Sequence, residues 1–548
     1  MVIQFFSSLK FIYWNLLLLP IIFLISCNSD IYKKKDLSKT DFVYLEGKHF
    51  KIKDKAFFPI MLNYVVCFRK IENDYLLSPI KEYENPEIFE TNTKDSLETQ
   101  IRGHLQLIKE MGFNSIRLVF DRVSCENLKY YYSADNQNLY LKKDFESIFS
   151  GLENFLKIVE EYDIKVMLLI KAPVENIDLE KFTERLLHKF QNNACIFAYD
   201  FFNEPLYFDQ EQLLSDQQKR KKEDAYKIVL KWKRMMNEYA PNQLFTIGFS
   251  EPIEVFEWDP SILPVDFIAF HTYHPLRVPN EIYWYSKYTN KPWMIGETAL
   301  PADGDSISYD EQRHFMKEVY ERIIDCGGSG LAWWQFQDMI AGNMEAKFTG
   351  IIDHKGSTKT KDGKYTILGS IKPAAKEIAN FKEYKAKPAT QMVNYYNMLG
   401  YNNFVLCGKI INSINGKPIE GAVIRGWNEN WSIGMNTFTN EKGDFTLYFN
   451  DLCTHFEISA PKMSKIKFDY KTNYYPITKK KYNILSLPMQ FSEYHGISYK
   501  PFLLSNNNSD SINADPYIFN FDASKFNKAK FIGFMGIKEL TPLSFLAN

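Results

Sequence analysis

The feature that most constrains the fold is an alternation of short apolar runs with amphipathic segments between residues 42 and 385. The apolar runs are nearly continuous, as strands covered on both faces must be. There are eight: Ile60–Tyr64, Asn114–Val119, Lys165–Ile170, Ile196–Phe202, Leu244–Gly248, Asp266–Phe270, Trp293–Gly296 and Gly330–Trp334. Eight such units in roughly 340 residues predict an α/β fold, the (β/α)₈ TIM barrel.

Five of the intervening segments carry apolar residues at helical spacing. They are Ser96–Met111, Asp144–Tyr162, Leu179–Phe190, Lys222–Tyr239 and Tyr309–Cys326. Gly112 and Gly327 follow two of them, at the position where a helix commonly ends on a glycine. The stretch Ser250–Pro264 is interrupted by proline, so we expect it to be mostly loop.

Residues 1–26 predict a signal peptide. Lys10 precedes an apolar run over 11–25 that is too short and too asymmetrically flanked for a membrane span. The sequence Leu24-Ile25-Ser26-Cys27 resembles a bacterial lipobox, which implies that Cys27 becomes the lipidated first residue. We therefore expect a protein lipid-anchored in the bacterial cell envelope, on the outer membrane surface or a periplasmic face, with residues 27–41 as a tether. The alternative is an ordinary signal peptide in which Cys27 is incidental.

Charge and cysteine content exclude several classes of protein. The 66 Lys and Arg nearly cancel 67 Asp and Glu, so nothing suggests a nucleic-acid partner. Balanced charge and 16% aromatic residues also exclude disorder for most of the 548 residues. The six cysteines after Cys27 show no CxxC spacing, so no zinc site is expected. Cys195 and Cys326 adjoin apolar runs, and we expect both to be buried free thiols.

After a linker over 386–402 the pattern changes to short β-rich runs with turn signals. The runs Phe404–Ile411, Ala422–Trp427 and Phe445–Phe449 predict a small all-β sandwich domain over 403–490. The stretches Lys417–Val423 and Thr439–Phe445 resemble the carboxypeptidase-regulatory-like module, which implies a spacer or docking role without catalytic residues. Residues 491–548 form a C-terminal extension to which the sequence assigns no structure.

Two glutamates stand at the ends of the fourth and seventh predicted strands, Glu204 and Glu297. Functional side chains of a TIM barrel lie at the C-terminal ends of its strands, and a buried carboxylate there is costly unless it is paired or useful. Their separation of 297 − 204 = 93 residues fits three further βα steps at roughly 30 residues each. Two carboxylates about 5 Å apart across a barrel mouth form the catalytic pair of a retaining glycosidase.

Residues 42–385 resemble glycoside hydrolase family 5, a retaining (β/α)₈ family of clan A that includes cellulases and β-mannanases. The matching motifs follow the predicted strands in order: Asn63-Tyr64, Gly112–Arg117, Asn203-Glu204-Pro205, His271-Thr272-Tyr273, Glu297 and Trp334-Gln335. The resemblance implies an enzyme, a retaining O-glycoside hydrolase that cleaves β-linked polysaccharide or oligosaccharide by double displacement. Mannan or glucan is the expected polymer.

The resemblance assigns the central chemistry to four residues. Glu204 is implied as the acid/base and Glu297 as the nucleophile. Arg117 is implied to hold Glu297 ionised, and Tyr273 to donate a hydrogen bond to it. No metal or organic cofactor is expected, because two carboxylates suffice for this displacement.

Four further residues are implied to line the sugar site. Asn203 would bind the 2-hydroxyl, and His271 would help to set the proton of Glu204. Trp334 would form the platform under the sugar, and Asn63 would add a polar contact. Because neighbouring residues of a strand point to opposite faces, Trp333 is expected in the layer that packs against the helices.

One motif departs from the family. Lys171-Ala172-Pro173 stands where many members have a histidine near the end of strand three. The short motifs at strands six and eight are most similar to those of β-mannanases, but the choice between mannan and glucan stays open. Endo or exo action also stays open, since it depends on loops around the site.

Two alternatives come from other functional classes. One is a catalytically silent, carbohydrate-binding surface lipoprotein, against which the intact pair Glu204 and Glu297 argues. The other is an adhesion protein in which the C-terminal domain has the main role. For single residues, Arg117 could be purely structural and His271 could be a core histidine. The basic run Lys219–Lys222 suits a solvated helix start or loop rather than a nucleic-acid patch.

Overall fold

A computed structural model gives the structure of the chain. It describes residues 40–546 except for 82–89, 126–127, 132–144, 171–176, 210–219, 274, 276, 341–346, 354–357, 362–363, 368–369, 380–383, 391–395, 397–400, 402, 429–433, 450–452, 470–474, 478–480, 484–519 and 523–530. The predicted signal peptide with Cys27 and the Lys171-Ala172-Pro173 motif lie outside these residues. No helix in the described part is long and apolar enough to cross a membrane.

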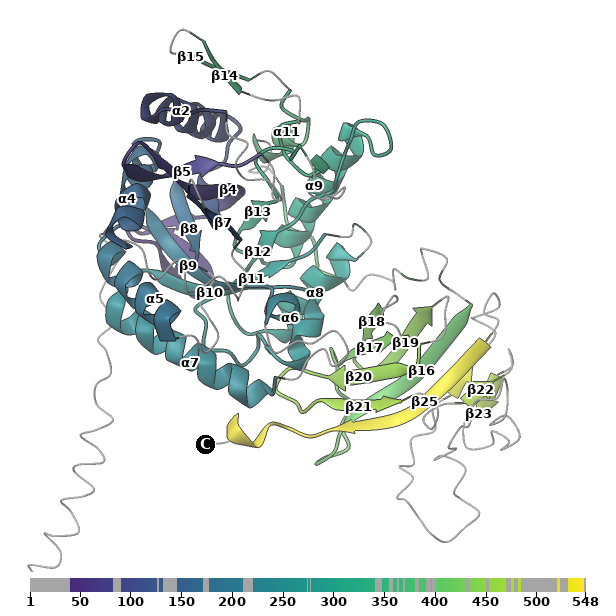
Figure 1. Cartoon of the computed structure of the whole chain (residues 1–548). Helices are drawn as coiled ribbons and strands as arrows, with labels where there is room; N and C mark the ends of the chain where they lie inside the picture. Colours follow the sequence, from purple (N-terminus) through teal and green to yellow (C-terminus); the bar gives the residue numbers. More distant parts are fainter. Residues whose placement is uncertain are drawn as a thin grey trace, which may run out of the picture.

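Eight parallel strands close into a barrel, so the predicted (β/α)₈ fold is confirmed (Figure 1). In spatial order they are β4 (Ile60–Ile71), β6 (Ser115–Cys125), β8 (Lys165–Leu169), β9 (Ile196–Asn203), β10 (Leu244–Phe249), β11 (Ile268–His271), β12 (Trp293–Glu297) and β13 (Leu331–Trp333). Strand β4 pairs with both β13 and β6, which completes the ring. Antiparallel partners β5 (Asp74–Pro79) and β7 (Leu128–Tyr131) extend β4 and β6 beyond it.

The five predicted helices are present as α2 (Lys94–Glu110), α4 (Phe145–Glu161), α5 (Ile177–Phe190), α7 (Lys222–Tyr239) and α9 (Tyr309–Asp325). Gly112 and Gly327 follow helix ends with φ of 93° and 72°, which glycine adopts readily. The loop expected over 250–264 contains only the 3₁₀ turn η3 (Pro252–Phe256). The sequence did not predict α6 (Pro205–Phe208) or α8 (Val278–Tyr288). The short helix α11 (Ala375–Ala379) follows the last barrel strand.

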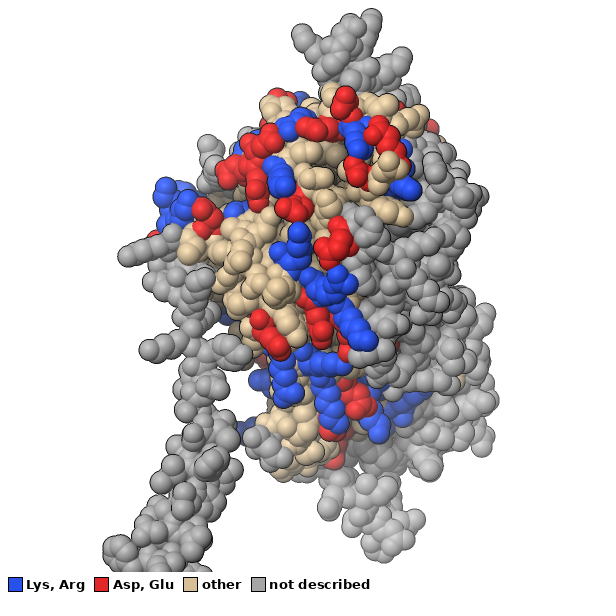
Figure 2. Space-filling model, turned by 60° about the vertical axis from the view of Figure 1, so that its left-hand side comes forward, with Lys and Arg blue, Asp and Glu red and all other residues tan. Residues whose placement is uncertain are grey.

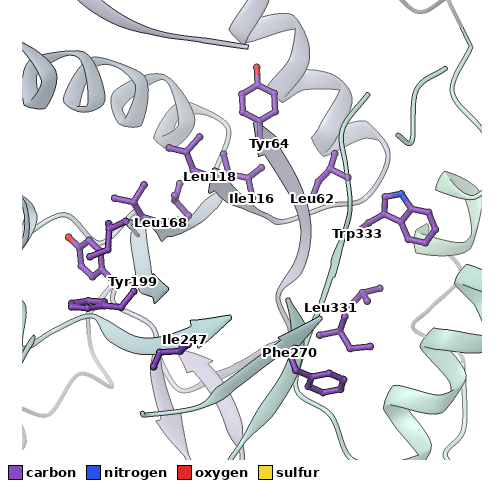
Figure 3. Close-up of a cluster of buried hydrophobic side chains, with 14 of the residues drawn as sticks. Leu62, Tyr64, Ile116, Leu118, Leu168, Tyr199, Ile247, Phe270, Leu331 and Trp333 are labelled. Atoms are coloured by element: carbon purple, nitrogen blue, oxygen red, sulfur yellow. The ribbon is translucent and has the colours of Figure 1, made fainter. Parts of the chain in front are cut away.

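Side chains alternate between the two sides of the barrel wall. Outward-facing residues such as Leu118, Phe270 and Trp333 pack under the helices (Figure 3). The lowest inward layer is apolar and meets Phe50 of β2 (His49–Ile52), which packs edge-on against Phe267 at 5.1 Å. Together with β1 (Tyr44–Glu46) and β3 (Lys55–Phe57), β2 forms a small sheet beside this layer. The apolar filling at this end leaves polar side chains for the opposite end of the strands.

The outer face of the helices is covered by charges of both signs (Figure 2). Ion pairs join neighbouring helices, for example Arg102 of α2 with Glu161 of α4, and Lys189 of α5 with Glu153 of α4 at 3.2 Å. In the part of this face that is not grey in Figure 2, blue and red side chains are interspersed. Such a surface suits solubility rather than the attraction of a polyanion.

Residues beyond 403 form two four-stranded sheets that share one hydrophobic cluster, and we call them the two-sheet unit. One sheet has the order β19 (Asp444–Phe449), β16 (Phe404–Asn412), β25 (Phe531–Leu540), β22 (Tyr475–Ile477). The other has the order β18 (Gly434–Phe438), β17 (Val423–Trp427), β20 (His455–Ser459), β21 (Ile466–Asp469). Strand β25 lies in the segment to which the sequence assigned no structure.

The remaining elements are short. They are the hairpin β14 (Thr358–Lys361) with β15 (Lys364–Ile367), the pair β23 (Lys481–Asn483) with β24 (Asn520–Asp522), and the 3₁₀ turn η10 (Ser544–Leu546). The five cysteines whose side chains the structure describes are free thiols. Of the two expected to be buried, Cys195 is buried and Cys326 is only partly so.

The two-sheet unit packs directly against the barrel, on the side of α8 and η3 (Figure 1). Val423 of β17 belongs to the barrel's own hydrophobic cluster. The indole Nε1 of Trp284 on α8 donates to the carbonyl of Gly421 at 2.9 Å. The buried Lys222 ammonium donates to Asp259 of the barrel and to the carbonyl of Ala460, each at 3.0 Å. Apolar and polar contacts therefore join the two parts into one packed body.

Candidate active site

Above the apolar layer, Arg117 of β6 occupies the centre of the barrel with no exposed surface. Its Nη1 donates to Asn63 Oδ1 at 3.0 Å and to Glu297 Oε1, its Nη2 to Asn203 Oδ1 at 2.9 Å, and its Nε to Asp200 Oδ2 at 2.9 Å. Burial on its own would lower the pKa of Arg117, but the charges of Asp200 and Glu297 raise it above its usual value. The guanidinium is therefore a fixed positive charge that orients four side chains from three strands, β4, β9 and β12.

Glu297 ends β12 and accepts hydrogen bonds on both carboxylate oxygens. Arg117 donates to Oε1 and the Tyr273 hydroxyl donates to Oε2. Burial and the neighbouring Glu297 charge raise the pKa of Tyr273 well above its ordinary value, so the phenol stays protonated and remains a donor. Both contacts stabilise a negative charge on Glu297.

Glu204 follows the end of β9 in the left-handed region, with φ 46° and ψ 67°. Its backbone N–H donates to the carbonyl of Gly248 at 2.7 Å, and its Oε1 lies 2.9 Å from Nδ1 of His271. Burial raises the pKa of Glu204 to about 7, against the opposing effect of Arg117. A non-glycine residue held in this conformation is typical of functional sites, where surrounding contacts fix a disfavoured backbone.

His271 at the end of β11 lies between the two glutamates, with Nδ1 3.6 Å from Glu297 Oε1. Its ring fills the space left by Gly248 and Gly296, where an added Cβ would approach the imidazole to 2.9 and 3.0 Å. Burial lowers the pKa of His271 to about 4, so the ring is neutral at pH 7. Nε2 has no hydrogen-bond partner in the described structure. The tautomer with its proton on Nδ1 avoids a buried, unpaired N–H and donates to Glu204.

The two carboxylates approach each other across the mouth. One atom each from Glu204, His271 and Glu297 lie within 4.8 Å of one another. This set has the donor types of a cation site, but the guanidinium of Arg117 already neutralises Glu297 from behind. Glu204 and Glu297 therefore face each other across the mouth in different electrostatic settings, one next to the neutral ring of His271 and the other next to the guanidinium of Arg117.

Asn63, which was expected to contact the sugar, lies behind the carboxylates together with Arg117. Asn63 has no exposed surface, and its Nδ2 donates to the carbonyls of Gly296 and Trp333 at 3.1 Å each. Its Oδ1 accepts from Arg117, so the amide supports the guanidinium, which corrects the expectation of a direct sugar contact. Arg117, equally buried, likewise acts on the carboxylates rather than on an exposed surface.

The two tryptophans divide between the faces as predicted. Trp333 is buried, donates from Nε1 to the carbonyl of Thr349 at 2.9 Å, and packs near Phe315 of α9. Trp334 is only partly buried and packs against the cluster that includes Val65 and Leu169. It therefore lies on the mouth side of the strands, where a ring can meet a ligand.

Sequence reasoning missed Asp200, which is fully buried and contacts Arg117. The signal was present, because Asp200 is a lone acidic residue inside the apolar run Ile196–Phe202. An unpaired charge at such a position is expensive, so a buried cationic partner follows from it. Glu254, also fully buried, was missed for lack of any local pattern.

Comparisons with known proteins add the following. No protein-family model and no curated protein sequence matches the chain. Similar solved structures include the exo-β-1,4-mannosidase Op5Man5 from Opitutaceae bacterium strain TAV5, with TM-score 0.43, 14% identity and coverage of 62% of this chain and 61% of that one. GH5_18 from Streptomyces cattleya has TM-score 0.41, 12% identity and coverage of 58% and 80%. β-Mannanase from the blue mussel Mytilus edulis has TM-score 0.38, 12% identity and coverage of 54% and 91%. The chain thus spans less than two thirds of the first of these proteins and shares little sequence with any of the three.

Proposed function

We propose that the chain is a retaining glycoside hydrolase that cleaves β-linked polysaccharide or oligosaccharide. One observation carries the proposal: Glu204 and Glu297 place carboxylate oxygens within 4.8 Å of each other in opposite electrostatic settings. Retaining enzymes separate their two carboxyl groups by about 5–5.5 Å, whereas inverting enzymes need about 6.5–9.5 Å to admit a water. The short separation favours direct attack by a carboxylate.

In the first step Glu204 is the acid and Glu297 the nucleophile. With a pKa of about 7, Glu204 still carries its proton in neutral solution and gives it to the glycosidic oxygen as that bond breaks. Glu297, held between Arg117 and Tyr273, attacks the anomeric carbon and forms a glycosyl ester. Because Nδ1–H of His271 occupies Oε1 of Glu204, the proton to be donated resides on Oε2.

In the second step Glu204 acts as the base, and a water molecule is the attacking group. Having given its proton to the leaving group in the first step, Glu204 is left ionised next to the ester, with a carboxylate oxygen within 4.8 Å of Glu297. The ionised Glu204 then takes a proton from a water molecule that attacks the ester. Two inversions at one carbon give net retention, and every proton is accounted for by Glu204 and water.

Three further side chains would hold the sugar. Because Oδ1 of Asn203 accepts from Arg117, its Nδ2 is the group left to donate to a 2-hydroxyl. Trp334 would supply an apolar face for the sugar ring, and the Tyr273 hydroxyl would lie beside the anomeric carbon through its contact with Glu297. We propose mannan or glucan as the polymer, on the motifs at strands six and eight.

A panel of β-linked polysaccharides and oligosaccharides tests the proposal. We expect at least one β-mannan or β-glucan to be cleaved, with the β-anomer as the first product by NMR. A 2-fluoroglycoside inactivator should label Glu297, which peptide mapping will locate. The α-anomer as first product, or a label elsewhere, would contradict retention through Glu297.

The alternative is a catalytically silent carbohydrate-binding protein. It predicts saturable binding of the same polysaccharides with no product at any enzyme concentration, and equal binding by wild type and Glu297→Gln. The raised pKa of Glu204 favours the enzyme, because a carboxyl tuned near neutrality serves proton transfer and contributes nothing to binding alone. In either case we propose attachment to the cell envelope through lipidated Cys27, with a docking role for the two-sheet unit.

A further inference from the structure

Glu254 lies on η3 with no exposed surface and contacts the segment that follows Glu204. Its Oε1 accepts from the backbone N–H of Leu206 at 3.2 Å, from the backbone N–H of Ser250 at 3.1 Å and from Ser250 Oγ at 2.9 Å. A buried carboxyl is retained only when its contacts compensate for lost hydration. These contacts join two segments that are about 50 residues apart, the loop after β10 and the short helix α6.

Helix α6 begins immediately after Glu204 and needs an acceptor for its first N–H. The side chain of the residue before a helix usually provides that acceptor. Glu204 makes no such cap, because its Oε1 meets His271 in the barrel mouth instead. Pro205 has no N–H, so Leu206 carries the first free donor of the turn, and Glu254 accepts from it. Glu254 thus replaces the cap that Glu204 gives up.

The backbone of Glu204 is held on both sides by the same strand and loop. The backbone N–H of Glu204 donates to the carbonyl of Gly248 on β10. The backbone N–H of Leu206 donates to the carboxyl of Glu254, in the loop that follows β10. These two anchors fix the left-handed conformation that aims the Glu204 carboxyl into the mouth. Strands β17 and β20 of the two-sheet unit pack on η3 and keep Glu254 in place from outside.

The carboxyl of Glu254 is neutral near pH 7. Burial raises its pKa to about 8, while its hydrogen bonds from Ser250 and Leu206 lower it and the nearby Glu204 raises it further. Glu254 contacts Leu206, which is two residues after Glu204. Because Glu254 is neutral, it adds no charge that would oppose the deprotonation of Glu204. Glutamine reproduces its shape and its accepting oxygen.

We propose that Glu254 is a positioning residue for the acid/base Glu204, and this inference rests on the function proposed above. It touches neither the sugar nor the reacting atoms and acts by fixing the turn after Glu204. Loss of the acceptor should therefore impair protonation of the leaving group while sparing attack by Glu297.

Leaving-group dependence distinguishes this role from general support of the fold. An activated aryl glycoside such as a 2,4-dinitrophenyl β-glycoside departs without protonation, whereas an unactivated β-linked disaccharide requires the acid. For Glu254→Leu we expect kcat/KM on the disaccharide to fall by about 30-fold or more, which is part of the roughly 10²–10⁴-fold that general acid catalysis contributes. On the activated glycoside the loss should be less than about threefold. Glu254→Gln should stay near wild type on both.

Three further variants and measurements complete the test. Ser250→Ala removes one donor to Glu254 but leaves the Leu206 contact, so it should keep the wild-type ratio between the two substrates. Glu254→Asp withdraws the acceptor by one methylene and replaces Glu254→Leu if that variant fails to fold, as checked by circular dichroism. The basic limb of the pH profile should shift in Glu254→Leu and stay in place in Ser250→Ala.

Each outcome has one reading. Equal losses on both substrates, or no loss in Glu254→Leu and Glu254→Asp, would overturn the positioning role while leaving the hydrolase intact. A wild-type protein that cleaves neither an activated nor an unactivated glycoside, of gluco or manno configuration, would overturn both the hydrolase and this inference.

Discussion

Asp200 contacts Arg117 in the middle of the barrel, at 2.8 Å between Oδ2 and Nη2, and neither side chain has any exposed surface. The second oxygen of Asp200 accepts from the backbone N–H of Gly248 at 2.8 Å. The guanidinium of Arg117 is therefore shared by Asp200 and Glu297. Because both carboxylates contact it, the position of Glu297 depends on that of Asp200. A buried charge network of this kind is costly to break from either end.

Asp200→Ala should lower the free energy of unfolding by about 3–5 kcal/mol, because it leaves a buried guanidinium short of one counter-charge. Denaturant titration with the slope held constant measures this change. Asp310→Ala removes an exposed aspartate of α9 that pairs with Arg313, and it is the matched control. Exposed ion pairs contribute about 0–1 kcal/mol, so the control should shift the midpoint only slightly. A loss in the Asp200 variant no larger than in the control would contradict the paired burial.

Replacing either of the two carboxylates proposed to be catalytic should remove hydrolysis while leaving the fold intact. Glu204→Gln is expected to lose about 10²–10⁴-fold in kcat/KM on unactivated substrates, since the general acid is gone. Glu297→Gln should lose more, since no covalent intermediate can form. Added azide should restore turnover of activated substrates by Glu204→Gln only. Near-wild-type rates in both variants, with exposed Glu110→Gln as the control, would refute the assignment.

Activity should fall as pH rises through about 7. The folded-state pKa of Glu204 is raised by burial to about 7, so the protonated acid needed for glycosylation disappears above that pH. The same shift means that the folded chain binds more protons than the unfolded chain between about pH 4.5 and 7, and stability decreases with pH over this window. A kcat/KM profile on an unactivated substrate measures the first effect, which the Glu204→Gln variant should lack. Its stability should still fall with pH, but less steeply, because Glu254 keeps its own raised pKa.

Deletion of residues 395–548 should destabilise the barrel rather than release an independent enzyme. Lys222 would lose the Ala460 carbonyl, and Asp259 would lose the Lys462 N–H that donates to it at 2.9 Å. Each buried polar group left unsatisfied costs about 1–3 kcal/mol, and the surface around Trp284 becomes exposed. Differential scanning calorimetry should show a lower Tm. A truncated barrel as stable as the full chain would show that the two-sheet unit is a separable appendage.

Cys27→Ser should release the protein from the membrane fraction or block its processing. The prediction follows from the lipobox Leu24–Cys27 after an apolar run. Metabolic labelling with a fatty acid measures lipidation, and fractionation measures attachment. Unchanged labelling of Cys27→Ser would rule out this cysteine as the anchor site, and Cys326→Ser serves as the control.

The barrel strands could be predicted because a strand buried on both faces consists of apolar residues almost throughout, and such runs are visible in the sequence. Helix α8 could not, since it lacks an amphipathic pattern: Trp284 faces Gly421 while Tyr285 stacks on Phe270. The buried side of α8 also carries the polar residues Asn280 and Glu281, so apolar residues do not recur at helical spacing along the segment. Strand β25 escaped prediction for a related reason, because its partner β16 is remote in sequence.

The candidate site was predictable to the extent that its residues end strands. Glu204, His271, Tyr273 and Glu297 meet because parallel strands of a barrel bring their ends to one rim. Asp200 lies within β9, below that rim. In the sequence it is recognisable only as a charged residue inside an apolar run. Glu254 reaches the site from a loop, and the contact that matters is to a backbone N–H, which no side-chain pattern records.

The pairing of β16 with β25 has a consequence for how the chain becomes folded. Phe404 and its parallel partner Phe531 are 531 − 404 = 127 residues apart, so this contact closes late and slowly compared with the neighbouring βα units. Leu543 and Phe545, which follow β25, pack against the hydrophobic cluster of the barrel. Until they arrive, the nearly completed barrel displays apolar surface on that side. During the interval before β25 docks, this surface is accessible to proteases and to aggregation.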